Sequence, residues 1–221
     1  MFNLTLKIEN HKVPFNWINF IDLFDVEIAK NLVETYPVDN YRTIVSNTSR
    51  QYNYDVRALT NLKTGYVEHK DSLSESWLNL ANYINSKDYK NFICQQTGID
   101  VLDLPVEVNV YKYAKNCFMD AHQDLNIKVL TQVIYFNDEW DEKNGGYLSI
   151  LNSKNTQDIH EKVMPIVGNS VIIIRSENSW HSVEATTCEK SRRSVTITFY
   201  KKGSSSPMWI DPKYPLHNNI D

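Results

Sequence analysis

The feature that most constrains the fold is a series of short strand-like segments in the second half of the chain. These segments are rich in β-branched and aromatic residues, and turn signals rather than helical patterns separate them. They span residues 104–113, 128–137, 146–151, 158–165, 170–175, 181–185 and 192–201. Many short strands at even spacing are typical of a sandwich or barrel, so we expect a mainly β core.

The first hundred residues have a different pattern. Alternating apolar residues predict a strand over residues 2–8, and helices are predicted near residues 25–35 and 87–97. Another helix should follow the capping-box-like Ser72-Leu73-Ser74-Glu75, with Trp77, Leu80, Ala81 and Ile84 at helical spacing. The polar stretch 38–70 is long for a plain connection, so it holds either short strands or a functional loop. We predict residues 1–100 as support with a substrate lid at 38–70, residues 101–202 as the catalytic core, and residues 203–221 as a tail, all within one compact domain. The tail either packs through Trp209, Ile210 and Tyr214 or frays.

Composition and charge exclude several classes of protein. The chain has 221 residues and a formal charge of −4, with no Lys/Arg run, which argues against a nucleic-acid binder. No run approaches the roughly twenty apolar residues of a membrane span, and the N-terminus lacks the pattern of a signal peptide. Cys94, Cys117 and Cys188 are odd in number and far apart, which predicts reduced thiols and a cytoplasmic location rather than a disulfide framework or zinc knuckle.

A candidate metal site lies in the strand-rich half. His122 and Asp124 are two residues apart and leave an extended strand on the same face, and His181 begins a later strand. We expect His181 to come from the facing sheet. Two imidazoles and one carboxylate on one face of an octahedral metal suit Fe(II) and leave three positions open. A zinc hydrolase would also use three protein ligands, and ordinary structural histidines are the simplest alternative.

The order of these and other residues resembles a known family. The pattern reads Tyr113…His122-x-Asp124…Tyr135-Phe136-Asn137…Gly145-Gly146-Tyr147-Leu148…His181-x-Val183…Arg192-x-Ser194-x-Thr196. It looks like the prolyl-4-hydroxylase-like branch of the Fe(II)/2-oxoglutarate-dependent dioxygenases, over about residues 104–200. The resemblance implies a double-stranded β-helix core, a jelly-roll or cupin-like fold, with flanking helices. It also implies that His122, Asp124 and His181 hold iron.

The same resemblance implies a co-substrate pocket. A basic residue past the second histidine binds the far carboxylate of 2-oxoglutarate in this family, and Arg192 and Arg193 compete for that role. Strand alternation favours Arg192, because it shares a face with Ser194 and Thr196, whose hydroxyls can bind the same carboxylate. Four more residues match pocket positions of the family: Tyr135, Tyr113, Val133 and Leu148.

The implied reaction is hydroxylation of an aliphatic carbon, with Fe(II), 2-oxoglutarate and O₂ as cofactors and ascorbate as an optional activator. A carboxylate at Asp124 favours hydroxylation over halogenation, since halogenases of this superfamily have a small residue there. The resemblance points first to a prolyl or other residue of a peptide or protein. A free amino acid or small biosynthetic intermediate is the alternative substrate, and a cupin-like metal-binding protein without turnover is the non-enzyme alternative. Candidate substrate contacts are Arg57, Trp140 and Trp180.

Overall fold

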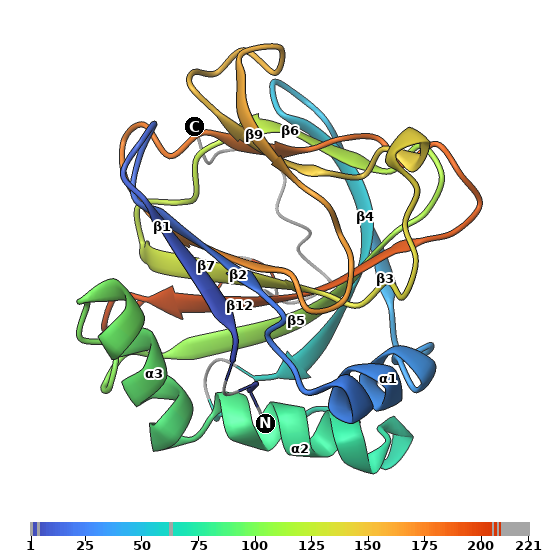
Figure 1. Ribbon diagram of the computed structural model, residues 1–221, viewed down its shortest axis with the longest axis vertical. Helices are drawn as coiled ribbons and strands as arrows, with labels where there is room; N and C mark the ends of the chain where they lie inside the picture. Colours follow the sequence, from blue (N-terminus) through green and yellow to red (C-terminus); the bar gives the residue numbers. More distant parts are fainter. Residues whose placement is uncertain (1, 4, 62–63, 205, 207, 209–221) are drawn as a thin grey trace.

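A computed structural model describes residues 2–3, 5–61, 64–204, 206 and 208 (Figure 1). Its helices are α1 (Val26–Glu34), α2 (Glu75–Ile84) and α3 (Lys87–Thr97), with short 3₁₀ turns η1 (Lys70–Ser72) and η2 (Glu142–Asn144). Its strands are β1 (Lys7–His11), β2 (Trp17–Ile21), β3 (Arg42–Asn47), β4 (Gln51–Thr60), β5 (Val106–Tyr113), β6 (Phe118–His122), β7 (Lys128–Tyr135), β8 (Leu148–Leu151), β9 (Ile159–Val163), β10 (Ser170–Ile174), β11 (His181–Val183) and β12 (Arg192–Tyr200). None of the described helices is long and apolar enough to span a bilayer.

All of these strands form one continuous antiparallel sheet. The order is β1-β2-β10-β7-β12-β5-β4-β6-β11-β8-β9, and β3 pairs with β4 beside this path. Figure 1 shows the sheet curling around so that β6 and β9 lie across from β7 and β12. Strand β4 makes this curl possible, because residues 55–60 pair with β5 while Tyr52 and Asn53 pair with β6. The result is a curled half-barrel with an inner face and an outer face.

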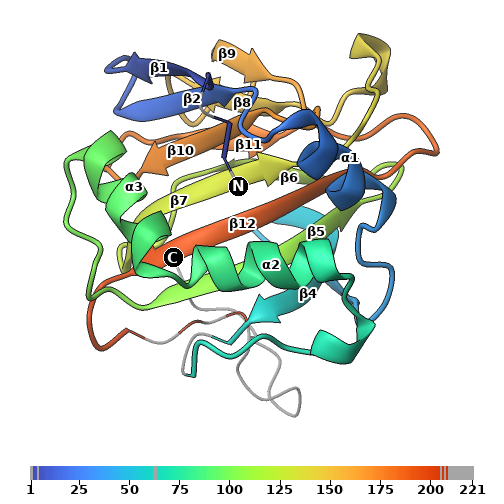
Figure 2. The ribbon, with the colours of Figure 1, turned by 60° about the horizontal axis from the view of Figure 1, so that its bottom comes forward.

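Period-two alternation along β5 and β12 separates two cores. Val195, Ile197 and Phe199 of β12 lie in the outer core, which also holds the buried faces of the helices. The inner core contains Tyr111 and Tyr113 of β5. On β12 the residues that alternate with the outer set are polar, and Arg192, Ser194 and Thr198 are buried. Figure 2 shows α2 lying across β12 and β5 on the outer side. The helices therefore cover one face, and the polar residues of β12 face into the half-barrel.

The helices lie near their predicted positions, although α2 is capped by Ser74 rather than by the first serine of the capping-box-like Ser72-Leu73-Ser74-Glu75, and the Asp25 side chain makes no cap to α1. The Ser74 hydroxyl caps α2 by accepting from the Trp77 backbone N–H, and α2 buries Trp77, Leu80, Ala81 and Ile84. Helix α3 ends at Gly98, which has φ of 70° in the left-handed region. The buried Trp77 indole also donates to the Leu32 carbonyl at 3.0 Å, which links α2 to α1.

The predicted fold class is confirmed, and each of the seven predicted segments after residue 100 contains a strand. The predicted segments do not include β2 or the bounds of β6, although His122 was expected on a strand and does end β6. For residues 38–70 the strand alternative is the one observed, since β3 and β4 lie in the sheet. The predicted strand over residues 2–8 is displaced, because β1 spans Lys7–His11. The packing predicted for Trp209, Ile210 and Tyr214 lies outside the described residues.

Candidate metal centre and co-substrate pocket

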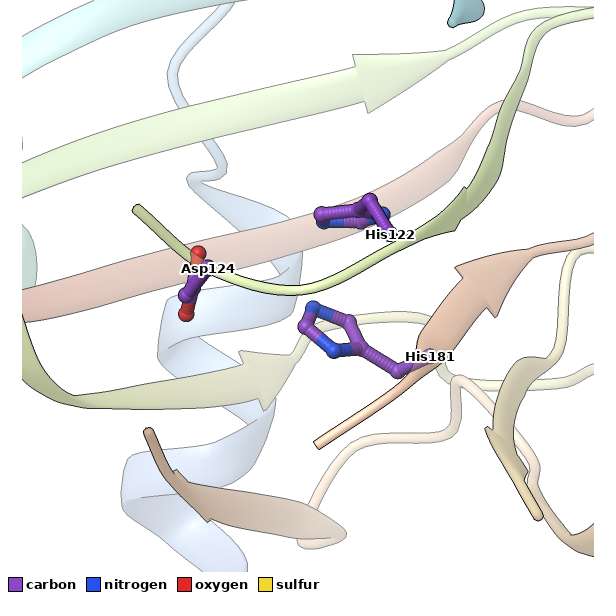
Figure 3. A group of neighbouring side chains, drawn as sticks. All are labelled: His122, Asp124 and His181. Atoms are coloured by element: carbon purple, nitrogen blue, oxygen red, sulfur yellow. The ribbon is translucent and has the colours of Figure 1, made fainter. Parts of the chain in front are cut away.

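His122, Asp124 and His181 converge inside the half-barrel. One ligand atom from each lies within 4.8 Å of the other two, and all three residues are buried. Figure 3 shows both imidazole rings and the carboxylate directed toward a common space. His122 ends β6, Asp124 follows in the next turn, and His181 begins β11. We expected His181 on the facing sheet, and this was wrong: β11 pairs directly with β6, and His181 is the register partner of His122.

Both imidazoles are held in the form that binds metal. The Nδ1 atom of His122 lies 2.9 Å from the Asp120 carbonyl oxygen, and that of His181 lies 2.9 Å from the Ser179 carbonyl oxygen. Because a carbonyl only accepts, each Nδ1 carries the proton and each Nε2 is left as a lone-pair donor. Burial lowers the pKa of His181, and burial and then the charge of Arg50 lower the pKa of His122 well below its usual range. Neutral imidazole is therefore favoured at this site.

Asp124 is ionised and oriented from two sides. Burial alone would raise its pKa, but the positive charge of Lys128 and the hydrogen bond from Lys128 outweigh burial and lower it. Lys128 Nζ lies 2.5 Å from Oδ1, and the Thr131 hydroxyl donates to Oδ2 at 2.7 Å. A carboxylate beside two neutral imidazoles is the donor set that suits Fe(II), so the residues present fit this ion.

Arg192 lies in the same pocket as the three candidate ligands. Its side chain is 1% exposed, and its guanidinium carbon lies 5.0 Å from the ring centroids of both Tyr113 and Tyr135. Nε donates to the Gly146 carbonyl at 2.7 Å, and Nη1 donates to the Ser194 hydroxyl at 3.0 Å. A planar cation held by these contacts is well suited to a bidentate carboxylate.

Arg193 lies on the other side of the sheet. Its guanidinium carbon is 5.3 Å from the ring centroid of Tyr36, a residue of the outer core. The alternation of β12 therefore separates the two arginines as predicted, and of the two only Arg192 lines the pocket.

The other predicted co-substrate residues also line this pocket or border it. Val133, Leu148, Ser194, Thr196 and Tyr113 are lining residues. Tyr135 is buried beside Arg192, and its hydroxyl makes no hydrogen bond of ordinary geometry with any described residue. Burial raises the pKa of both Tyr113 and Tyr135 to about 12, so both phenols are protonated donors at neutral pH.

Sequence reasoning missed several other lining residues: Arg50, Tyr54, Tyr111, Met119, Lys128, Thr131, Ile173, Val183 and Met208. Alternation could have found three of them. Thr131 shares a strand face with Val133, Tyr111 with Tyr113, and Val183 with His181. No local pattern marks Arg50, which the β3–β4 turn brings to the pocket.

The structure does not bring the three predicted substrate contacts into the pocket. Val56 lies in the inner core and Leu59 in the outer core, so Arg57, which follows Val56 and is two residues before Leu59, points to the helix side. There its buried guanidinium contacts the Asp39 carboxylate at 2.5 Å and the Ser72 hydroxyl at 2.9 Å. Trp140 donates to the Gly145 carbonyl at 2.8 Å and so supports the turn that holds Arg192. Trp180 is half-buried beside β8, where its carbonyl accepts from Leu151 N–H at 3.0 Å.

Comparison with known proteins agrees with this geometry. Residues 107–200 match the family profile of the 2OG-Fe(II) oxygenase superfamily, whereas no curated protein sequence matches the chain. A prolyl-4-hydroxylase from Pseudomonas putida has a similar structure, with a TM-score of 0.62, 18% identity, and coverage of 84% of this chain and 92% of that one. The match to a prolyl hydroxylase from Trichoplax adhaerens, solved with a hypoxia inducible factor peptide fragment, has a TM-score of 0.51, 12% identity, and coverage of 79% and 76%.

A third similar structure is the α-ketoglutarate-dependent epimerase SnoN from nogalamycin biosynthesis. Its TM-score is 0.55 at 14% identity, with coverage of 83% of this chain and 76% of that one. At these identities the similarity shows a shared fold. The matched residues 107–200 contain all three candidate metal ligands and Arg192. Residues 107–200 are therefore a 2OG-Fe(II) oxygenase domain on the fold of the prolyl-4-hydroxylases, and the chain is a 2-oxoglutarate-dependent dioxygenase whose cofactors are Fe(II), 2-oxoglutarate and O₂.

Proposed function

We propose that this enzyme hydroxylates an aliphatic carbon of an amino-acid residue, a prolyl residue first of all, in a peptide or protein. The similar folds of two prolyl hydroxylases support this substrate class, and one of those structures holds a peptide fragment. The observation that carries the proposal is the convergence of two neutral imidazoles and one carboxylate in the same pocket as Arg192. A three-residue facial donor set leaves metal positions open for co-substrate and O₂.

In this proposal His122, Asp124 and His181 hold Fe(II). The histidines bind through Nε2, because each Nδ1 faces a backbone carbonyl. Thr131 keeps the Asp124 carboxylate oriented through its hydrogen bond to Oδ2. When bound, Fe(II) and 2-oxoglutarate activate O₂ for oxidation of a substrate C–H bond, with succinate and CO₂ as co-products.

Arg192 receives the far carboxylate of 2-oxoglutarate. The Tyr135 phenol is buried beside the Arg192 guanidinium, and because an arginine can only donate, the phenol proton is available to the same co-substrate. Ser194 and Thr196 supply hydroxyls from the same face of β12, Tyr113 supplies a phenol, and Val133 and Leu148 supply apolar walls. Together these residues orient the co-substrate and limit the access of water to it.

Residues 101–202 thus supply the ligands for both cofactors. Residues 1–100 support this core through α1–α3 and through the strands that they add to the sheet. Two residues of the predicted 38–70 lid line the pocket, Tyr54 of β4 and Arg50 of the turn between β3 and β4. We assign substrate contact to this turn.

A small substrate is the second candidate. The fold similarity to SnoN, which by its description acts in nogalamycin biosynthesis, supports a free amino acid or a small biosynthetic intermediate. Both candidates use the same metal centre and differ only in what enters the pocket.

Substrate-independent turnover tests the metal centre. Purified protein with Fe(II), ascorbate and 2-oxoglutarate should form succinate slowly, and His122→Ala should abolish this. His160→Ala is the matched control, because His160 is exposed on β9 and outside the pocket. Succinate formation that survives His122→Ala at the unaltered rate contradicts the proposed function.

A mass-spectrometric screen tests the substrate class. Proline-containing peptides with blocked termini and free amino acids are incubated with enzyme, Fe(II) and 2-oxoglutarate. A gain of one oxygen atom on a peptide supports the first candidate, and a gain confined to free amino acids removes it.

A further inference from the structure

A second arginine, Arg50, reaches the pocket from the turn between β3 and β4. It lines the pocket together with Met119 and the candidate metal ligands. Its Nη2 atom lies 3.7 Å from the Met119 sulfur, which is a weak acceptor. Its guanidinium carbon lies 5.3 Å from the ring centroid of Tyr52. The sulfur and the ring are weak partners for a cation, so these contacts offset little of the free-energy cost of partly burying the guanidinium.

Arg50 has no counterion among the described residues. No described carboxylate lies within 4.0 Å of its guanidinium, although nine other ion pairs of that length occur in the same part of the chain. Its Nε atom is buried and has no hydrogen-bond partner there. A partly buried cation with an unsatisfied donor gains free energy when an anionic acceptor binds. The pocket therefore favours an anion at this point.

The positive charge of Arg50 lies at a different point of the pocket from the positive charge of Arg192. A row of aromatic rings connects the two arginines. Arg192 lies 5.0 Å from Tyr113, Tyr113 lies 5.7 Å from Tyr54, and Tyr54 lies 5.6 Å from Tyr52, which Arg50 faces. Arg192 already bonds Gly146 and Ser194 at its end of the row. A co-substrate carboxylate on Arg192 thus leaves Arg50 available to a different ligand.

The turn that carries Arg50 is fixed at both sides. The Ser46 hydroxyl donates to the Arg50 carbonyl at 2.9 Å, and the Gln51 N–H donates to Asp120 Oδ2 at 2.9 Å. Asp120 belongs to β6, which leads directly to His122. The position of Arg50 is therefore coupled to the strand that carries a candidate metal ligand, which lowers the entropy cost of binding at this point.

We propose that Arg50 binds a carboxylate of the primary substrate and so selects substrates that carry one. The inference rests on the proposed function, since it places the reacting substrate in the pocket of the metal centre. The carboxylate comes either from the free end of a small amino-acid-like substrate or from an acidic side chain of a peptide. The tyrosine rings between the two arginines receive the apolar part of that substrate.

Two matched probe pairs test this proposal by binding. N-acetyl-proline and its neutral amide differ in a free carboxylate, and doubly blocked Pro-Glu and Pro-Gln dipeptides differ in a side-chain carboxylate. Binding is measured by calorimetry without O₂, on protein loaded with Fe(II) and 2-oxoglutarate. For at least one pair the carboxylate member should bind about tenfold or more tightly than its amide, and Arg50→Gln should remove this preference. Arg50→Lys should retain part of it, and Arg193→Gln, on the opposite face of the sheet, should retain all of it.

The results separate this inference from the proposed function. Formation of the Fe(II)–2-oxoglutarate complex, followed by its absorbance without O₂, should be the same in Arg50→Gln and unaltered protein. If the unaltered protein does not form that complex, the proposed function is contradicted. If the complex forms but neither carboxylate probe is preferred, or if the preference survives Arg50→Gln, the role of Arg50 is overturned. The pair that shows the preference identifies the source of the carboxylate.

Discussion

The Nε atom of Arg192 donates a hydrogen bond of 2.7 Å to the carbonyl oxygen of Gly146. This contact joins β12 to the turn before β8, and Trp140 braces that turn by donating to the Gly145 carbonyl. The direction of the Arg192 guanidinium therefore depends on the backbone of a glycine turn. Placement of the co-substrate should be sensitive to that turn even though neither glycine has a side chain that contacts the co-substrate.

Gly146→Ala should weaken 2-oxoglutarate binding about tenfold and leave Fe(II) binding unchanged. A Cβ at this position would lie 3.2 Å from both Thr186 Oγ1 and Trp140 Cζ2, and the residue has φ of +70°. The added methyl group thus shifts the turn and with it the carbonyl that holds Arg192, and misplacement of a binding group costs affinity. Calorimetric titration of Fe(II)-loaded protein without O₂ measures the effect. Gly98→Ala is the control, because Gly98 has the same φ of +70° and nothing within 4 Å of the added Cβ.

Arg192→Lys should raise the KM for 2-oxoglutarate about tenfold or more, whereas Arg193→Lys should change it less than about twofold. A lysine keeps the charge but loses the two parallel donors that match a carboxylate. Steady-state succinate formation measures both variants. If both variants change the KM for 2-oxoglutarate equally, the face of β12 on which an arginine lies does not decide whether it binds the co-substrate.

Thr131→Val should weaken Fe(II) binding about tenfold, since loss of a hydrogen bond that orients a metal ligand has this order of effect. The Thr131 hydroxyl donates to Asp124 at 2.7 Å, and valine has the same shape without the donor. Thr198→Val is the matched control, because Thr198 is buried on β12 as the register partner of Thr131. Competition with a chromogenic chelator measures the affinity. If Thr131→Val and Thr198→Val weaken Fe(II) binding equally, Thr131 has no specific role in orienting Asp124.

Stability should fall at alkaline pH, because burial raises the pKa of Tyr113 and Tyr135 from 10.0 to about 12. Above pH 10 the unfolded chain loses these protons while the folded chain keeps them, so the free energy of unfolding decreases as pH rises toward 12. Each phenol contributes at most about 1.4 kcal/mol per pH unit to this slope. Denaturant unfolding at several pH values measures it, and Tyr135→Phe should make the decrease shallower. An unchanged slope in that variant would be inconsistent with a protonated, buried Tyr135.

The sequence by itself determined which residues share a strand face. The alternation of β12 places Arg192, Ser194 and Thr196 together and puts Arg193 on the other side, as the structure has it. It also determined where α3 ends, because the stop at Gly98 is a local property. The metal ligands could be named for a related reason: their residue types and order follow a family pattern over residues that the family profile also matches.

Only the tertiary structure decided which distant strands become neighbours. It placed β11 beside β6, so that His181 meets His122 within one side of the half-barrel. It bent β4 between β5 and β6, which turned Arg57 toward Asp39 under the helices and brought Arg50 to the pocket. Local periodicity reports the face on which a side chain lies, but strand pairing depends on packing among residues far apart in the chain. For that reason the charge of Arg50 near the metal centre could be found only in the folded protein.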